Sequence, residues 1–78
     1  MTEYGITLTW DDEAAVWIAV NDEIPIALEN GSLDALMVQV KHAVPEMLAE
    51  NKKLPASDEV QLRFSAEHIE RLDLNRYL

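Results

Sequence analysis

The sequence contains no cysteine, so it offers neither a disulfide nor a cysteine-ligated zinc site nor a thiol nucleophile. It contains only two glycines, which rules out a glycine-rich phosphate-binding loop. No apolar run approaches the roughly 18–20 residues of a membrane-spanning helix. The first residues, Met1–Tyr4, lack the charged-then-apolar pattern of a signal peptide. We therefore expect a soluble cytoplasmic protein that makes no contact with a membrane.

Positive charge is also scarce. Six Lys and Arg residues stand against fifteen Asp and Glu residues, and the formal net charge is −9. Phosphate contacts require a cationic surface, so we expect no direct binding of nucleic acid by this chain. A basic protein is the natural partner for such a surface, because complementary charge speeds association and selects partners.

The N-terminal part of the chain alternates between apolar and other residues with the period of two that is typical of β-strands. The three alternating sets are Tyr4, Ile6, Leu8 and Trp10; then Val16, Ile18 and Val20; then Ile24, Ile26 and Leu28. Short polar breaks separate these runs, which predicts an antiparallel meander of three strands. We expect the three sets to face the core.

A helix is predicted over residues 33–50, because the apolar period changes there to steps of three and four. The apolar stripe consists of Leu33, Leu36, Met37, Val40, Val44, Met47 and Leu48. Ser32 is a good N-cap residue, and Pro45 inside the segment predicts a kink. The stripe is too short for a coiled coil, and the strands need it as their cover, so we interpret it as core.

A fourth strand is predicted at Val60, Leu62 and Phe64, after a polar loop over residues 51–58. The predicted fold is therefore α+β, a two-layer sandwich of order β-β-β-α-β, with the meander packed on one long helix and the fourth strand beside the first. Residues 1–65 would form this domain, and residues 66–78 a C-terminal tail. In the tail, Ser65 is expected to cap a short helix whose Ile69 and Leu72 face inward.

Trp17 would stand on the face of the sheet that the helix leaves uncovered. That face is predicted to show Gly5, Thr7, Thr9, Ala15, Trp17, Ala19, Ala27, Glu59, Gln61 and Arg63. A tryptophan among small residues is a plausible contact anchor, since tryptophan is enriched at binding hot spots. The alternative is that the C-terminal tail folds over it.

Two acidic clusters interrupt the strands, one at Asp11, Asp12 and Glu13 and the other at Asp22 and Glu23. They should lie at opposite ends of the second strand, and neither has the spacing of a known calcium loop. Solvated turns are the simplest interpretation, and a metal site in the first cluster is the rival one. We find no catalytic constellation, so we expect no enzyme activity, no catalytic residue, no cofactor and no metal.

The order and spacing of several segments resemble those of the HicB-like antitoxin family. The resemblance rests on residues 6–19 (ITLTWDDEAAVWIA), residues 21–25 (NDEIP), residues 31–36 (GSLDAL) and residues 43–51 (AVPEMLAEN). It covers roughly residues 4–51, and the late Pro-Glu-x-Leu element of the family corresponds to Pro45 and its neighbours. Many members carry a C-terminal DNA-binding domain, for which residues 66–78 are too few.

The resemblance implies an antitoxin domain similar to a partial double-stranded-RNA-binding fold that does not itself bind RNA. Such a domain would bind and occlude a small basic mRNA-cleaving toxin, a HicA-like ribonuclease, and would be a homo-oligomer. The residues we expect to contact the partner, chosen for charge and exposure, are Asp11, Asp12, Glu13, Trp17, Asp22 and Glu23. The alternative is a stand-alone homo-oligomeric domain of the same fold without a toxin partner.

Overall fold

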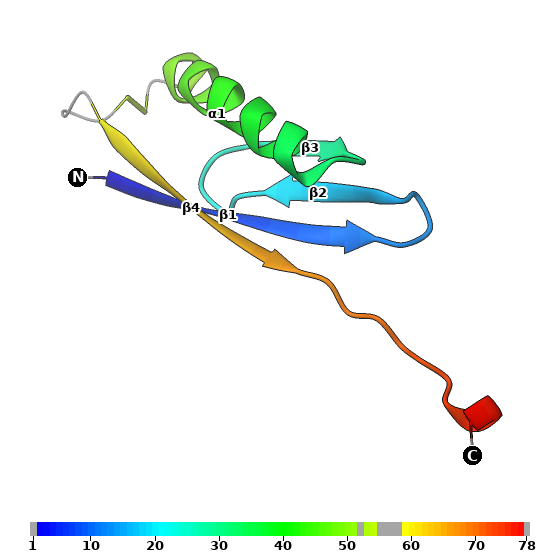
Figure 1. Ribbon diagram of the computed structural model, residues 1–78. Helices are drawn as coiled ribbons and strands as arrows, with labels where there is room; N and C mark the ends of the chain where they lie inside the picture. Colours follow the sequence, from blue (N-terminus) through cyan, green and yellow to red (C-terminus); the bar gives the residue numbers. More distant parts are fainter. Residues whose placement is uncertain (1, 52, 55–58, 78) are drawn as a thin grey trace.

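The computed structural model describes residues 2–51, 53–54 and 59–77. The elements follow as β1 (Thr2–Asp11), β2 (Val16–Val20), β3 (Ala27–Asn30), α1 (Leu33–Glu50), β4 (Val60–Glu67) and a 3-10 turn, η1 (Asn75–Tyr77) (Figure 1). This confirms the predicted order β-β-β-α-β. Part of the predicted loop, residue 52 and residues 55–58, lies outside the described residues.

The strands form one sheet in the order β3-β2-β1-β4. β1 pairs antiparallel with β2, and β2 antiparallel with β3, as a meander requires. β4 pairs parallel with β1, so the sheet is mixed and the fourth strand lies beside the first, as predicted. Helix α1 makes this parallel return possible, because it carries the chain back across the sheet before β4 begins.

Helix α1 begins at Leu33 and ends at Glu50, as predicted. Its N-cap is Ser32, whose Oγ accepts a hydrogen bond from the Ala35 backbone N–H at 3.2 Å. The fully buried residues follow one stripe at spacings of four: Leu36, Val40, Val44 and Leu48. The stripe continues through Pro45, whose own side is exposed.

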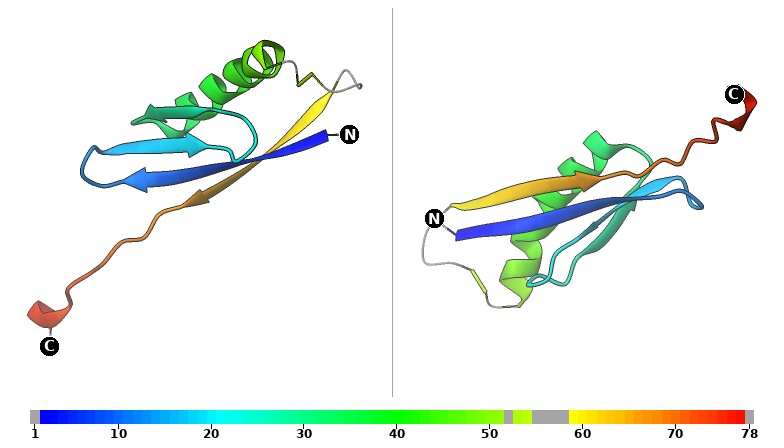
Figure 2. Two further views of the ribbon diagram at one scale, coloured as in Figure 1. Left: turned by 180° about the vertical axis from the view of Figure 1, so that it is seen from behind. Right: turned by 90° about the horizontal axis from the view of Figure 1, so that it is seen from below.

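The helix covers one face of the sheet and lies closest to β2 and β3, while no described segment forms a layer on the other face (Figure 2). Beneath the helix, Ala19 is fully buried beside Ile6 and Leu8. A methyl group at position 19 allows the helix to approach the sheet closely, because a larger side chain would occupy the same space. The core therefore sits between α1 and the middle of the sheet.

The predicted orientation of β2 was wrong. The register pairs Leu8 with Ala19 and Trp10 with Trp17, and paired residues share a face. Trp17 and Ala19 therefore lie on the helix side, whereas Ile18 and Val20 lie on the uncovered face. The side chains on both faces of β2 are apolar, so the alternating pattern could not show which face packs against the helix. The hairpin connection decided the register.

The third strand is shorter than predicted, because β3 starts at Ala27. Ile24 and Ile26 are buried as expected, but they belong to the loop before it. In that loop the Ile26 N–H donates to the Ile24 carbonyl at 2.7 Å, which forms a tight turn in place of a ladder bond. Asn21 holds the start of the loop, since its Oδ1 accepts hydrogen bonds from the backbone N–H groups of Glu23 and Ile24.

The predicted helix after Ser65 was wrong as well. β4 continues through Ser65 to Glu67, and the chain then runs on without regular structure to η1. Ile69 and Leu72, which were expected to face inward, are 81% and 79% exposed. We call residues 68–77 the C-terminal arm; it projects away from the sheet in the direction of β4 (Figures 1 and 2).

Within the described part of the chain, no helix has both the length and the apolar character of a membrane span.

Candidate partner-binding surface

The hairpin between β1 and β2 presents the first acidic cluster at one end of the sheet. Asp11 organises it, because its Oδ1 accepts hydrogen bonds from the backbone N–H groups of Glu13 at 3.1 Å and Ala14 at 3.3 Å. Ala15 closes the loop with a φ of 55°, in the left-handed region. Asp12 and Glu13 are thereby held at the tip of the hairpin, where both are exposed.

Three rings meet next to this hairpin, on the helix side of the sheet. Trp10 and Trp17 pack edge to face, with centroids 5.6 Å apart. His68, the first residue of the C-terminal arm, stacks on Trp10 at 5.4 Å and meets Trp17 edge-on at 5.7 Å. We call these three residues the aromatic cluster. Both tryptophans are half-buried, so part of each ring remains accessible to a partner.

The acidic hairpin and the aromatic cluster are joined by a hydrogen bond. The Trp10 Nε1–H donates to Asp12 Oδ1 at 3.2 Å. The structure therefore brings together four of the six predicted contact residues, Asp11, Asp12, Glu13 and Trp17, although Trp17 arrives from the opposite face of β2 to the one expected. We refer to the acidic hairpin and the aromatic cluster together as the hairpin surface.

The other two predicted residues do not join this surface. Asp22 and Glu23 follow β2, whereas Asp11–Glu13 precede it, so the two clusters lie at opposite ends of the strand as predicted. Five residues of extended chain separate them by roughly 16 Å. Both Asp22 and Glu23 are exposed. A partner that contacts both clusters has to span the length of β2.

The sequence interpretation missed Trp10 and His68 as members of the surface. The alternating pattern of β1 placed Trp10 on the face that packs against the core. The structure confirms the face, but Trp10 is only half-buried because the helix does not cover it. No sequence pattern indicated that His68 would join the tryptophans, because its position depends on β4 continuing past Ser65. His68 also contacts Glu70, because its Nε2 lies 2.6 Å from Glu70 Oε1.

Charge on the uncovered face of the sheet is organised around Glu3. Its carboxylate accepts two hydrogen bonds from the Arg63 guanidinium, at 3.1 and 3.2 Å, and one from Gln61 Nε2 at 2.6 Å. The hydrogen bonds from Arg63 and its positive charge lower the pKa of Glu3, and the same contact raises the pKa of Arg63. This bidentate pair ties β4 to β1 across the parallel ladder.

A second feature of the helix side is a groove of about 450 Å³ between α1 and β4. It exists because the helix covers β2 and β3 more closely than the edge strand β4. We call it the apolar groove; its lining residues are Met37, Lys41, Val44, Pro45, Val60, Leu62 and Phe64. None of these described lining residues is a carboxylate, and the positive charge of Lys41 lies at the helix wall of the groove.

No three His, Asp or Glu side chains come close enough to hold a metal ion in residues 2–51, 53–54 and 59–77. Neither acidic cluster supplies a converging set of oxygen ligands there. The hairpin surface is therefore characterised by its negative charge and its partly exposed aromatic rings.

Comparison with known proteins found a matching family and a solved structure of similar fold. The family profile described as a domain of unknown function, DUF1902, matches residues 3–75. The crystal structure of a hypothetical protein from the extremely thermophilic bacterium Thermus thermophilus is similar, with 32% sequence identity and a TM-score of 0.76. The similarity covers 90% of this chain and 99% of that one. No curated protein matches the chain.

Proposed function

The chain belongs to the DUF1902 family, and from the resemblance of residues 4–51 to HicB-like antitoxins and from the hairpin surface we propose that it is a HicB-like antitoxin. It binds a small basic mRNA-cleaving toxin, a HicA-like ribonuclease, and occludes it by protein–protein contact. The proposed activity needs no catalytic group and no cofactor in this chain. Its compartment is the cytoplasm, where such a toxin meets mRNA.

The observation that carries the proposal is the junction of acidic and aromatic residues at one end of the sheet. Asp12 is hydrogen-bonded to Trp10, and Trp10 packs on Trp17. Aromatic anchors surrounded by a polar rim are typical of protein interfaces. A toxin that binds RNA has a cationic surface, and the hairpin carboxylates can compete with RNA phosphates for that surface.

The formal charge of −9 gives the proposal a kinetic argument. An acidic protein and a basic one attract each other over distances of about a Debye length, so association is fast at low salt and slows as salt increases. Rapid capture suits an inhibitor that has to act before its toxin cleaves mRNA. The partly buried tryptophans then supply contacts that salt does not weaken, because apolar burial is not screened.

The experiment that tests the proposal starts from the gene next to the one encoding this chain. We expect that gene to encode a small basic protein that copurifies with the full-length chain and whose cleavage of RNA stops when the chain is added in equimolar amount. RNA cleavage is measured on a labelled transcript with and without the chain. Absence of a small basic neighbour, or a neighbour that neither binds nor is inhibited, would refute the antitoxin function.

A further inference from the structure

We propose that the C-terminal arm docks into the apolar groove of a second copy of this chain, so that two copies exchange their arms in a symmetric dimer. The inference concerns self-association and does not rest on the toxin proposed above. It starts from two apolar surfaces, one on the arm and one in the groove, that no described part of the single chain covers.

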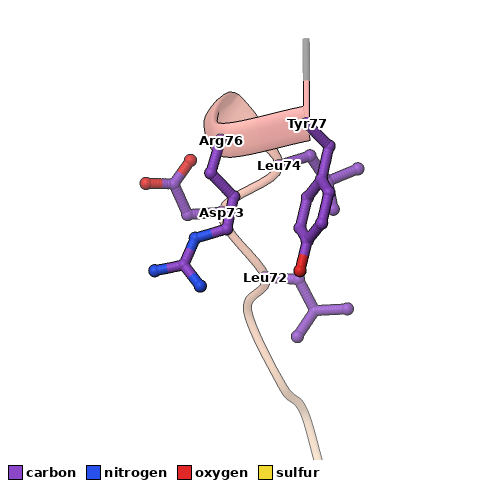
Figure 3. Close-up of a pocket in the computed structure, with 5 residues that line it drawn as sticks. All are labelled: Leu72, Asp73, Leu74, Arg76 and Tyr77. Carbon is purple, nitrogen blue, oxygen red and sulfur yellow. The ribbon is translucent and has the colours of Figure 1, made fainter.

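The arm carries large apolar side chains into solvent. The exposed fractions are 81% for Ile69, 79% for Leu72, 60% for Leu74 and 77% for Tyr77. At the tip, Leu72, Leu74 and Tyr77 lie on one side, whereas Asp73 and Arg76 lie on the other (Figure 3). A segment with one apolar and one charged side is suited to lie in a groove with its charged side towards water.

The arm does not fold back onto its own domain. The chain extends 60 Å along its long axis but only 22 and 19 Å across it. Its radius of gyration is 16.0 Å, whereas a compact chain of this length would have about 11–12 Å. His68 stacks on Trp10 at the start of the arm, and the residues that follow run away from the sheet (Figures 1 and 2).

The groove lies where an arm from another copy would arrive. β4 is an edge strand, and its outer edge offers backbone N–H and C=O groups to a neighbouring strand. Val60, Leu62 and Phe64 line the groove from this strand, and Pro45 lines it from the helix. An arm that adds beside β4 would place its apolar side against these residues, and self-complementary edges favour a twofold arrangement.

Charge favours a second copy over a basic partner as the occupant. Among the described residues, Lys41 is the charged one that lines the groove, and it would repel a cationic toxin. Lys41 is itself exposed, so a carboxylate on the solvent-facing side of the arm, Glu70 or Asp73, can reach it from the rim of the groove. The acidic hairpin surface, at the other end of the helix-side face, remains available to a basic protein.

Sedimentation velocity on the full-length chain over a wide concentration range tests the dimer. We expect a reversible monomer–dimer equilibrium that Leu72→Asp with Leu74→Asp weakens on the order of 30-fold or more, as for the loss of an interface hot spot. Val20→Asp with Val38→Asp is the matched control, since both valines are exposed and neither lines the groove or belongs to the arm. A monomer at every concentration, or a dimer that both pairs of substitutions affect equally, overturns the proposal.

Cysteine pairing identifies the occupant, because the native sequence has no cysteine of its own. Leu74→Cys in one chain and Lys41→Cys in another should give a disulfide-linked dimer when the two are mixed and oxidised. Replacing Lys41→Cys by Gln39→Cys, an exposed position about 160° around the helix from position 41, should reduce the yield at least about tenfold. A chain that carries both Leu74→Cys and Lys41→Cys and closes as a monomer would show that the arm occupies its own groove, which overturns the exchange.

Discussion

Trp10 and Trp17 stand directly opposite each other across β1 and β2, with their ring planes at 62°. This pairing defines which residues of β2 share a face with those of β1. Every second residue from Trp17 onwards shares the face of Trp10, so Ala19 comes to lie beneath the helix and Val20 on the uncovered face. The same pair, with His68 stacked against it, forms the part of the helix-side face that the helix does not cover.

The register predicts different effects on stability for substitutions at two neighbouring positions. Ala19→Leu should lower the free energy of unfolding by about 1–3 kcal/mol, because the larger side chain has to enter the space between sheet and helix. Val20→Leu, at a position 40% exposed, should change it by less than about 0.5 kcal/mol. Urea unfolding followed by circular dichroism measures both. A larger loss for Val20→Leu would contradict the register.

The hairpin loop contains a residue whose backbone is strained. Ala15 has a φ of 55°, where the Cβ of a non-glycine residue approaches the following carbonyl oxygen. Ala15→Gly should therefore raise the free energy of unfolding by roughly 1 kcal/mol. Ala14→Gly, in the same exposed loop but without a positive φ, should lower it or leave it unchanged. Thermal unfolding of the two variants distinguishes them, and a loss of stability in Ala15→Gly would count against the loop conformation.

The ion pair between β1 and β4 makes stability depend on pH. Arg63 lowers the pKa of Glu3 in the folded protein, so the pair stabilises the fold above the ordinary pKa of a glutamate. That contribution disappears as the pH falls through the lowered pKa of the folded state. An NMR titration of the Glu3 carboxyl should show this pKa return towards its ordinary value in Arg63→Met. Arg76→Met, which removes the same charge from the arm, should leave it unchanged; equal shifts would refute the pairing.

The N-cap of α1 is a further point of stability. Ser32 Oγ accepts a hydrogen bond from the Ala35 N–H. Ser32→Ala should lower the free energy of unfolding by about 1 kcal/mol, whereas Ser32→Asp should preserve it, because a carboxylate caps equally well and favours the helix N-terminus. Chemical denaturation measures both changes. No loss of stability in Ser32→Ala, or an equal loss in both variants, would contradict the capping role of the Ser32 side chain.

Much of the fold could be predicted from the sequence, because local signals agreed with each other. The helix bounds followed from the apolar stripe and Ser32, and Pro45 did not break the stripe. The fourth strand beside the first followed from one helix long enough to recross the sheet. These features depend on short stretches of chain, which a single sequence reports directly.

The features that escaped prediction depend on choices that the local pattern leaves open. In β2, Trp17 and Ile18 lie on opposite faces and are both apolar, so the connection between the strands decided which of them faces the helix. In the tail, Ile69 and Leu72 have helical spacing but are exposed in this chain. The aromatic cluster could not be inferred, because it requires both the hairpin register and the continuation of β4 to His68.

The most direct test of the antitoxin function is isothermal titration of the neighbouring small basic protein into charge-reversal variants. Asp12→Lys with Glu13→Lys alters the hairpin surface, and Asp22→Lys with Glu23→Lys makes the same change in net charge at the other end of β2. We predict that the first pair weakens binding on the order of 30-fold or more and the second by less than about threefold. Equal weakening by both pairs, or no binding by the unaltered chain, would contradict the account.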